Sequence, residues 1–430
     1  MNYRWWKAAL LGALLTIAPA MMVGHMVHWD CQKVKAAEEI VEEKGAYGLL
    51  VWPQNLNAVR SEVEIFAAAP KNMTADAPIA GALYRNGEIY SNRVLLDMKK
   101  LPEGVPLFWR VRAYDLDGNP VSPYSQPAEL KSALIRTDRN APIPRPLPVK
   151  KNGTTLLFPV YAYTGNPGAT RYEIEVTDEY PENLNGFAPS VHRIYANQTE
   201  LTDLYDELPR IGTYYWRVRG MDTEGLPVGE WSLPQKMHTP KEGWTVGIYG
   251  DSISHGGGHL SFSPVDFAYS YETYLSFDSI NLSDSGNTSE MMVDRFERDV
   301  LPFHPKYLLI MGGTNSLRAG IPAASVIADL KRMQQMAREH GIIPILLTLP
   351  PVNPQNIEKA FREPTYEGWK DSFSEVNAFI RGEVHIDTAA PFEAMEELPT
   401  WLALDGIHGD WNMKQMMAEV INREFPLIRE

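Results

Sequence analysis

The segment Trp244–Ile253, with the sequence WTVGIYGDSI, decides how the C-terminal part of the chain folds. Its first six residues are mostly apolar and include the strand-favouring residues Val, Ile and Tyr, which predicts a buried strand. Gly250, Asp251 and Ser252 follow at once and predict a sharp turn at the end of this strand. A buried strand that runs directly into a polar turn is typical of a parallel α/β sheet.

Further apolar runs follow this segment, and helical patterns separate them. One helical pattern places Val326, Leu330, Met333 and Ala337 at i, i+4, i+7 and i+11, which gives the helix one apolar face. Continuous apolar strands that alternate with helices predict a parallel sheet covered on both sides, so residues 243–430 are expected to form a three-layer α/β/α domain. The remaining expected strands are Ser279–Leu282, Tyr307–Met311, Ile342–Leu347 and Val384–Asp387.

Polar residues with catalytic potential follow these strands. Ser252 comes after the first strand, Gly286 after the second and Asn315 after the third, while Asp405 and His408 stand near the C-terminus. In a parallel sheet the ligand site lies at the carboxyl ends of the strands, so these five residues are expected to meet in one cleft.

These blocks, GDSI, SGN, GGTN and LDGIH, resemble the SGNH (GDSL-like) hydrolase family over about Trp244–Phe425. The resemblance implies an esterase whose oxyanion hole consists of the backbone N–H groups of Ser252 and Gly286 and the side-chain amide of Asn315. Ser316 departs from the family, in which Asp often follows the block Asn, and this could change how Asn315 is held.

The residue types themselves also suggest nucleophilic catalysis. A serine hydroxyl needs a base to remove its proton, and His408 is the natural base because imidazole titrates near neutral pH. Asp405, three residues earlier, is expected to orient the imidazole and to stabilise its protonated form. His255 and His259 lack a third ligand at a suitable spacing, so neither a metal nor another cofactor is expected.

A repeat of about 107 residues precedes this region. Phe108–Asp115, FWRVRAYD, recurs as Tyr215–Asp222, YWRVRGMD, and the match continues through Tyr124 and Trp231. Alternating runs such as Glu62–Phe66 predict antiparallel strands with one face on a core and the other in water.

The two copies resemble fibronectin type III domains and are expected to be β-sandwiches over 45–140 and 141–240. Their Trp and Tyr residues could stack on carbohydrate, but their alternation favours burial in the sandwich cores. The proline-rich segment 141–148 predicts a semi-rigid linker, so the two units in series suggest a stalk that acts as a spacer.

The N-terminus resembles an export signal. Arg4 and Lys7 precede an apolar stretch from Ala8 to about Val23, so residues 1–30 are expected to be a signal peptide or a membrane anchor, and cleavage remains open. Residues 31–44 carry alternating Lys and Glu and predict a helical spacer. The protein is therefore expected to be exported and either secreted or attached to a membrane or the cell envelope.

The composition limits the partners. The chain has 54 acidic and 40 basic residues and a formal net charge of −14, which disfavours nucleic acid as a partner. Cys31 is the only cysteine, so no internal disulfide can form. We therefore expect an exported serine esterase that acts on an acylated small molecule or polysaccharide, with O-acetylated carbohydrate as the first candidate. The alternatives are a lipase or thioesterase and a non-catalytic glycan-binding adhesion protein.

Overall fold

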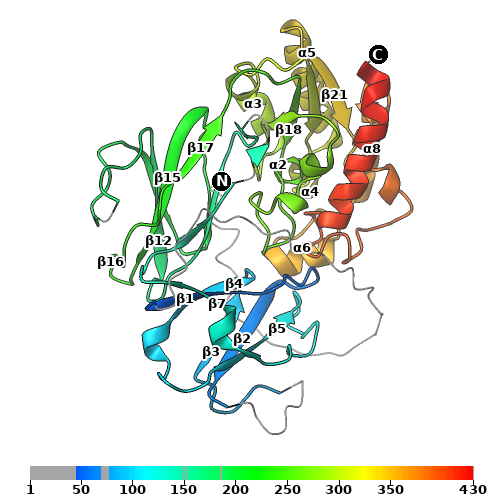
Figure 1. Cartoon of the computed structure of the whole chain (residues 1–430). Coiled ribbons are helices and arrows are strands. Elements are labelled where there is room, and N and C mark those ends of the chain that lie inside the picture. Colours follow the sequence, from blue (N-terminus) through cyan, green and yellow to red (C-terminus); the bar gives the residue numbers. More distant parts are fainter. Residues whose placement is uncertain (1–44, 69–76, 148, 151–152, 185, 430) are drawn as a thin grey trace.

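The computed structural model describes residues 45–68, 77–147, 149–150, 153–184 and 186–429. These residues form two units with antiparallel sheets, followed by one unit with a parallel sheet (Figure 1). The expected leader (1–30) and helical spacer (31–44) lie outside the described residues. Within the described part of the chain, no helix is both long and apolar enough to cross a membrane.

The first unit contains two antiparallel sheets that enclose a small apolar core with Leu50, Val63 and Ile65 at its centre. A three-stranded sheet has the order β4-β1-β7, and a four-stranded sheet has the order β3-β2-β5-β6. The strands are β1 (Tyr47–Val51), β2 (Arg60–Phe66), β3 (Tyr84–Ile89), β4 (Arg93–Asp97), β5 (Phe108–Tyr114), β6 (Ala128–Glu129) and β7 (Leu134–Thr137), with the short helices η2 (Met98–Lys100) and α1 (Leu130–Ala133).

The second unit repeats this pattern with the sheets β14-β11-β8 and β13-β12-β15-β16, and β17 also pairs with β15. The proline-rich segment supplies β8 (Ile143–Arg145), so part of the expected linker belongs to a sheet of this unit. The other strands are β9 (Val149–Lys150), β10 (Gly153–Thr154), β11 (Val160–Thr164), β12 (Arg171–Thr177), β13 (Arg193–Thr199), β14 (Asp203–Tyr205), β15 (Gly212–Met221), β16 (Pro227–Val228) and β17 (Gln235–Thr239). The fibronectin type III assignment of both units stays a prediction.

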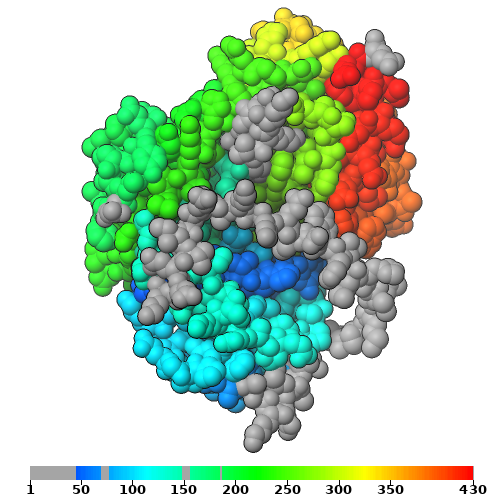
Figure 2. All heavy atoms as spheres, viewed as in Figure 1, coloured from blue at the N-terminus to red at the C-terminus, as the bar shows by residue number. Residues whose placement is uncertain are grey.

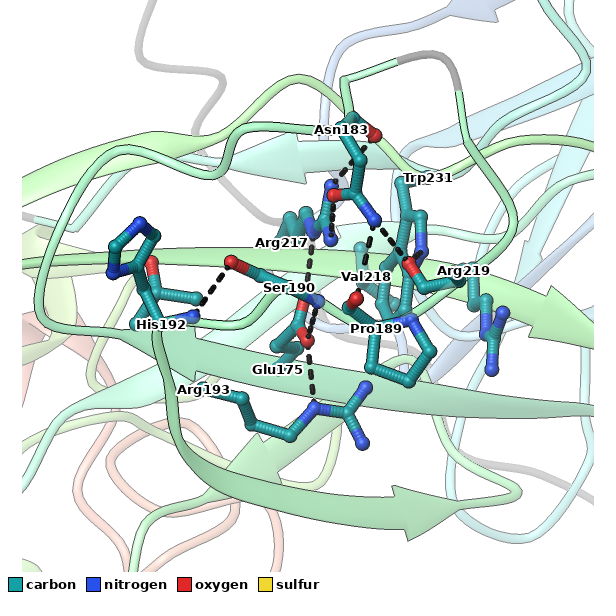
Figure 3. A network of polar contacts seen from close by, with 12 residues as sticks. Glu175, Asn183, Pro189, Ser190, His192, Arg193, Arg217, Val218, Arg219 and Trp231 are labelled. Atoms are coloured by element: carbon teal, nitrogen blue, oxygen red, sulfur yellow. Dashed lines mark hydrogen bonds and ion pairs between the residues drawn. The ribbon is translucent and has the colours of Figure 1, made fainter.

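The alternating strands do not present their polar face to water, which corrects the sequence-based expectation. Glu64 in β2 and Glu175 in β12 are fully buried. Glu175 accepts hydrogen bonds from the Arg193 Nε at 2.6 Å and from the Ser190 backbone N–H at 2.8 Å, and it pairs with Arg217 (Figure 3). Neighbouring guanidinium groups cover these carboxylates, so the outer face of each sheet carries a second, charged layer.

The repeated aromatic residues stabilise this layer or the apolar core. Trp216 lies in the core of the second unit, whereas the ring of Trp231 stacks on the guanidinium groups of Arg217 and Arg219, each 4.5 Å away (Figure 3). In the first unit, Tyr124 takes the corresponding place over Arg110. Both tryptophans are fully buried, so neither exposes a ring face on which a sugar could stack.

The third unit contains a five-stranded parallel sheet with the order β19-β18-β20-β21-β22. The strands are β18 (Val246–Gly250), β19 (Ser279–Asn281), β20 (Tyr307–Met311), β21 (Ile343–Leu347) and β22 (His385–Ile386). They are almost entirely buried, as expected for a sheet with helices on both faces.

Helices α3, α5 and α7 pack side by side, while α8 packs against η3, η4 and β22. The predicted apolar face of α5 is confirmed, because Val326, Leu330, Met333 and Ala337 are all buried. The helices are α2 (Ser252–His255), α3 (Ser289–Asp299), α4 (Thr314–Arg318), α5 (Ala323–Glu339), α6 (Pro354–Phe361), α7 (Trp369–Arg381), α8 (Trp411–Arg429), η3 (Phe267–Tyr269), η4 (Tyr271–Tyr274) and η5 (Ala390–Phe392).

The first unit contacts the third directly, which a linear stalk would not allow. Lys359 in α6 forms an ion pair with Asp117 at 2.9 Å, and the Ser261 hydroxyl donates a hydrogen bond to the Val59 carbonyl. In Figure 1 the first unit (blue to cyan) lies below α6, and Figure 2 shows the described parts of the three units packed together.

A segment of the second unit also extends the parallel sheet. Leu156 forms a parallel bridge with Asn281 of β19, supported by hydrogen bonds from the Leu157 N–H to the Asn281 carbonyl (2.9 Å) and from the Asn281 N–H to the Thr155 carbonyl (2.8 Å). Leu157 and Phe158 are fully buried within the core of the third unit. The second and third units therefore share a sheet edge and a hydrophobic core.

Candidate active site

Ser252 stands where β18 turns into α2. Asp251 caps this short helix, because its carboxylate accepts a hydrogen bond from the Ile253 N–H at 3.0 Å. This cap fixes the turn after the buried strand and makes Ser252 the first helical residue. Ser252 is 7% exposed, so its hydroxyl is sheltered but accessible at the carboxyl end of the sheet.

His408 and Asp405 lie in the loop that precedes α8, and the structure brings both to Ser252. The His408 Nε2 lies 2.9 Å from the Ser252 Oγ, and the His408 Nδ1 lies 2.9 Å from the Asp405 Oδ2. The other carboxylate oxygen of Asp405 accepts the backbone N–H groups of Ile407 (3.0 Å) and His408 (2.8 Å). A carboxylate, an imidazole and a hydroxyl thus form a continuous hydrogen-bonded chain, in which the proton of an attacking hydroxyl can pass to the imidazole.

The surroundings keep the Asp405 carboxylate ionised. Burial acts to raise its pKa, but the charge of His408, the hydrogen bond from His408 and the two backbone N–H groups together hold the pKa of Asp405 below its usual value. Asp251, only one residue before the serine, differs: burial raises its pKa to about 6.

Gly286 lies in the loop between β19 and α3, and Asn315 lies in the first turn of α4, which follows β20. The Asn315 side-chain amide donates to the Asn287 carbonyl at 3.0 Å, which places Asn315 beside the loop that contains Gly286. An amide nitrogen has two hydrogens, so Asn315 retains a second N–H for a ligand. Gly286 has φ +83°, a backbone conformation that favours glycine. Ser285 of this loop is hydrogen-bonded to the His255 ring at 2.8 Å, which connects it to α2.

Ser316, which departs from the expected family pattern, ties α4 to α3. Its hydroxyl accepts the Ser289 N–H at 2.9 Å, at the start of α3. Asn315 is thus held by its own hydrogen bond to the Asn287 carbonyl, and the bond between Ser316 and Ser289 fixes the helix in which it lies.

The two histidines beside the glycine-rich stretch have structural contacts. The His255 Nε2 lies 2.7 Å from the Phe158 carbonyl oxygen. Burial lowers the pKa of both His255 and His259 to about 4, so both rings are neutral at physiological pH. In the described ranges, no group of three or more His, Cys, Asp or Glu side chains could hold a metal ion.

Three residues near the site were missed by the sequence analysis. The Phe361 ring lies 5.8 Å from the His408 ring, edge to face. Asp410 and Lys414 are also buried, and they hydrogen-bond to the histidine loop at Leu404 and to the serine turn at Ile253. The signal that could have identified this pair is the spacing of four residues at the start of a helix, but such a pair is usually exposed to solvent.

One curated protein is similar in sequence to part of this chain. The uncharacterized lipoprotein YqeF of Bacillus subtilis (strain 168) is 40% identical over 83 residues, which is 18% of this chain and 34% of that protein. The chain therefore matches about a third of the length of this curated relative.

The chain is also similar in structure to solved GDSL-like enzymes. A GDSL-like lipase from Bacteroides thetaiotaomicron is 18% identical, with a TM-score of 0.35 over 44% of this chain and 89% of the other. A lipase/acylhydrolase from Enterococcus faecalis is 22% identical, with a TM-score of 0.33 over 43% and 95% of the two chains. A catalytic mutant of Axe2, an acetylxylan esterase from Geobacillus stearothermophilus, is 19% identical, with a TM-score of 0.33 over 43% of this chain and 94% of the other.

The family model for the GDSL-like lipase/acylhydrolase family matches residues 248–410. This range contains Ser252, Gly286, Asn315, Asp405 and His408. The C-terminal part of this chain, residues 248–410, therefore belongs to the GDSL-like lipase/acylhydrolase family.

Proposed function

We propose that the protein is a serine esterase that hydrolyses small acyl esters through an acyl-enzyme. The observation that carries this proposal is the hydrogen-bonded chain from the Ser252 hydroxyl through His408 to Asp405, with both distances at 2.9 Å. The match of this region to an acylhydrolase family supports ester hydrolysis as the reaction.

In the first half of the reaction, the Ser252 Oγ attacks the ester carbonyl carbon and its proton passes to the His408 Nε2. Asp405 stabilises the imidazolium that forms. The carbonyl oxygen becomes negatively charged, and the backbone N–H groups of Ser252 and Gly286 and the Asn315 amide are the proposed donors to it. When the intermediate collapses, His408 returns the proton to the leaving alcohol, and the acyl group remains on Ser252.

In the second half, a water molecule takes the place of the alcohol. His408 removes a proton from this water as it attacks the acyl carbon, and the same oxyanion donors stabilise the new intermediate. Its collapse returns the proton to Ser252 and releases the carboxylic acid. Apart from this water and the substrate, the groups that act in these steps are side chains and backbone groups of this chain.

The proposed substrate is an O-acetylated carbohydrate outside the cell or in the cell envelope. The export-like sequence of residues 1–30 favours a location outside the cytoplasm. A lipase or thioesterase would use the same catalytic groups on a longer acyl chain. A glycan-binding adhesion protein would use the cleft without turnover.

The experiment is hydrolysis of p-nitrophenyl acetate by the purified full chain. Wild type is expected to turn over, whereas Ser252→Ala is expected to lose at least about 10⁴-fold in kcat because the nucleophile is absent. Ser254→Ala is the matched control, since Ser254 is also buried in α2 but its hydroxyl accepts a hydrogen bond from Tyr271 at 2.9 Å instead of facing His408. Equal rates for wild type and Ser252→Ala would reject the proposed nucleophile.

The substrate is tested separately by acetate release from an O-acetylated polysaccharide, compared with hydrolysis of long-chain esters and thioesters. Preference for the acetylated polysaccharide supports the proposal. Preference for the long-chain substrates indicates the lipase or thioesterase. Binding of the polysaccharide with no release of acetate from any substrate indicates the adhesion protein.

A further inference from the structure

An acidic and a basic side chain are buried at the start of α8. Asp410, the residue before the helix, is 5% exposed, and Lys414 in its first turn is fully buried. The Lys414 N–H donates to the Asp410 carbonyl at 3.1 Å, so the two residues lie one turn apart. Neither residue takes part in the proposed proton transfer. Buried charges are costly unless they are paired or hydrogen-bonded, so their contacts need an explanation.

Each side chain binds a different segment of the active site. The Lys414 Nζ donates to the Ile253 carbonyl at 2.8 Å, immediately after the proposed nucleophile. One Asp410 oxygen accepts the Leu404 N–H at 3.1 Å, immediately before Asp405, and the other accepts the His259 N–H at 3.4 Å. The first turn of α8 and the residue before it therefore contact the serine turn and the histidine loop, whose Ser252 and His408 lie 156 residues apart in sequence.

This arrangement is not the one that stability alone would favour. Burial lowers the pKa of Lys414 to about 8, although the carboxylates of Asp251, Asp405 and Asp410 act in the opposite direction. Burial, and then the charge of Asp405, raise the pKa of Asp410 well above its usual value. Well-packed apolar residues in the place of buried charges are often neutral or stabilising, so stability alone does not explain these two groups.

We propose that Asp410 and Lys414, together the α8 brace, are positioning residues that hold the Ser252 turn and the Asp405–His408 loop at hydrogen-bonding distance. This inference rests on the proposed esterase function and adds a second set of residues to it. The α8 brace touches the backbone on both sides of the reacting groups, so its loss should change the alignment of Ser252 and His408 without removing either.

The test is steady-state hydrolysis of p-nitrophenyl acetate by full-chain Lys414→Met, which keeps an unbranched apolar stem but removes the donor. We expect kcat to fall about 10- to 100-fold, because a displacement on the order of 1 Å has this effect on a positioned reaction, while KM stays within about twofold. Asn422→Ala is the matched control: Asn422 also joins α8 to other backbone segments, donating to the Tyr274 carbonyl and accepting the Ser276 N–H, both at 2.8 Å.

A purely structural role would lower the melting temperature and the active fraction of both variants in the same way. The proposal is overturned if Lys414→Met keeps the wild-type kcat, or if active-site titration shows that its loss of rate is entirely a loss of folded enzyme. A lower kcat per titrated site in Lys414→Met, with an unchanged value in Asn422→Ala, supports it.

Amide hydrogen exchange of full-chain Asp410→Ala provides a readout that needs no activity. We expect the N–H groups of Leu404 and His259 to exchange at least about tenfold faster than in wild type, because both lose their acceptor. Unchanged exchange at both would overturn the α8 brace. If wild type hydrolyses no ester, the proposed function fails, and this exchange experiment then decides whether the α8 brace exists.

Discussion

The surroundings of Asp405 lower its pKa, whereas burial raises the pKa of Asp251 and of Asp410. The negative charge of Asp405 leads to a prediction for Asp405→Asn. The variant can still accept the backbone N–H groups of Ile407 and His408, but an amide nitrogen facing the His408 Nδ1 would donate a hydrogen and select the wrong imidazole tautomer. We expect kcat for p-nitrophenyl acetate to fall about 10³–10⁴-fold with little change in KM. Steady-state kinetics of the full chain provide the measurement.

Asp206→Asn is the matched control, since Asp206 is also a buried, hydrogen-bonded carboxylate but belongs to the second unit. Its kcat should equal that of wild type, and an equal loss in both variants would contradict the role of Asp405.

The pKa of Asp405 also determines the pH range in which this carboxylate stabilises the fold. Its pKa in the folded chain lies below the ordinary value of 3.8. Its contribution is therefore fully present above pH 3.8 and is lost as the pH falls through the lower, folded value. The difference in unfolding free energy between wild type and Asp405→Asn should be constant near neutral pH and shrink only below about pH 4.

At the scale of single residues, the sequence identified the groups proposed to perform the chemistry but not those proposed to position them. Ser252, Asp405 and His408 could be found because each follows a predictable strand or occurs in a short motif, and the structure brings the three together. Lys414 could not be found, because a helical lysine is normally solvated. Only the packing of α8 over the site shows that its ammonium group is buried.

At the scale of elements, the loop that carries Asp405 and His408 depends on Gly406. This residue has φ +83°, and a Cβ added there would lie 2.4 Å from the Asn353 carbonyl oxygen, which cannot move freely because it belongs to the backbone. Gly406→Ala should therefore combine a backbone penalty of about 1–2 kcal/mol with a displacement of the loop. We expect a lower melting temperature and at least a tenfold lower kcat, measured by thermal unfolding and ester hydrolysis.

Gly104→Ala separates these two effects. Gly104 also has a positive φ, +70°, but a Cβ there would meet nothing within 4 Å. This variant should lose a similar backbone term and keep the wild-type kcat. If both variants retain full activity, the loop geometry around Gly406 is less important for the site than the structure indicates.

The elements themselves were predictable where one physical effect dominates. Apolar periodicity identified α5, because its buried face packs on a uniform sheet. The alternating strands were predicted in the right places, but the prediction that their polar face is exposed to water was wrong. Alternation predicts only that two faces differ, and the burial of Glu64 and Glu175 depends on arginines from other strands that no local pattern reveals.

At the scale of the whole molecule, the three units depend on one another in a way that the sequence pattern did not predict. The repeat describes each antiparallel unit separately, and nothing in residues 155–158 distinguishes a strand of the second unit from an extension of the parallel sheet. Contacts between units arise from complementary surfaces, which become visible only after each unit has folded. The expectation of a stalk failed for this reason.

The shared sheet edge leads to the last prediction, that Phe158 stabilises the third unit although its neighbours in sequence form the second. Phe158→Ala removes a fully buried ring from the core of the parallel-sheet unit, which should cost about 3–5 kcal/mol. The temperature at which the full chain loses esterase activity should fall by roughly 10 °C. Phe66→Ala is the control, since Phe66 is also buried but lies in β2 and stacks on Phe108 of the first unit. Its inactivation temperature should change much less, because the ring contact that it loses lies in the first unit and not in the core beneath Ser252 and His408. Equal inactivation temperatures for the two variants would mean that the stability of the third unit does not depend on Phe158.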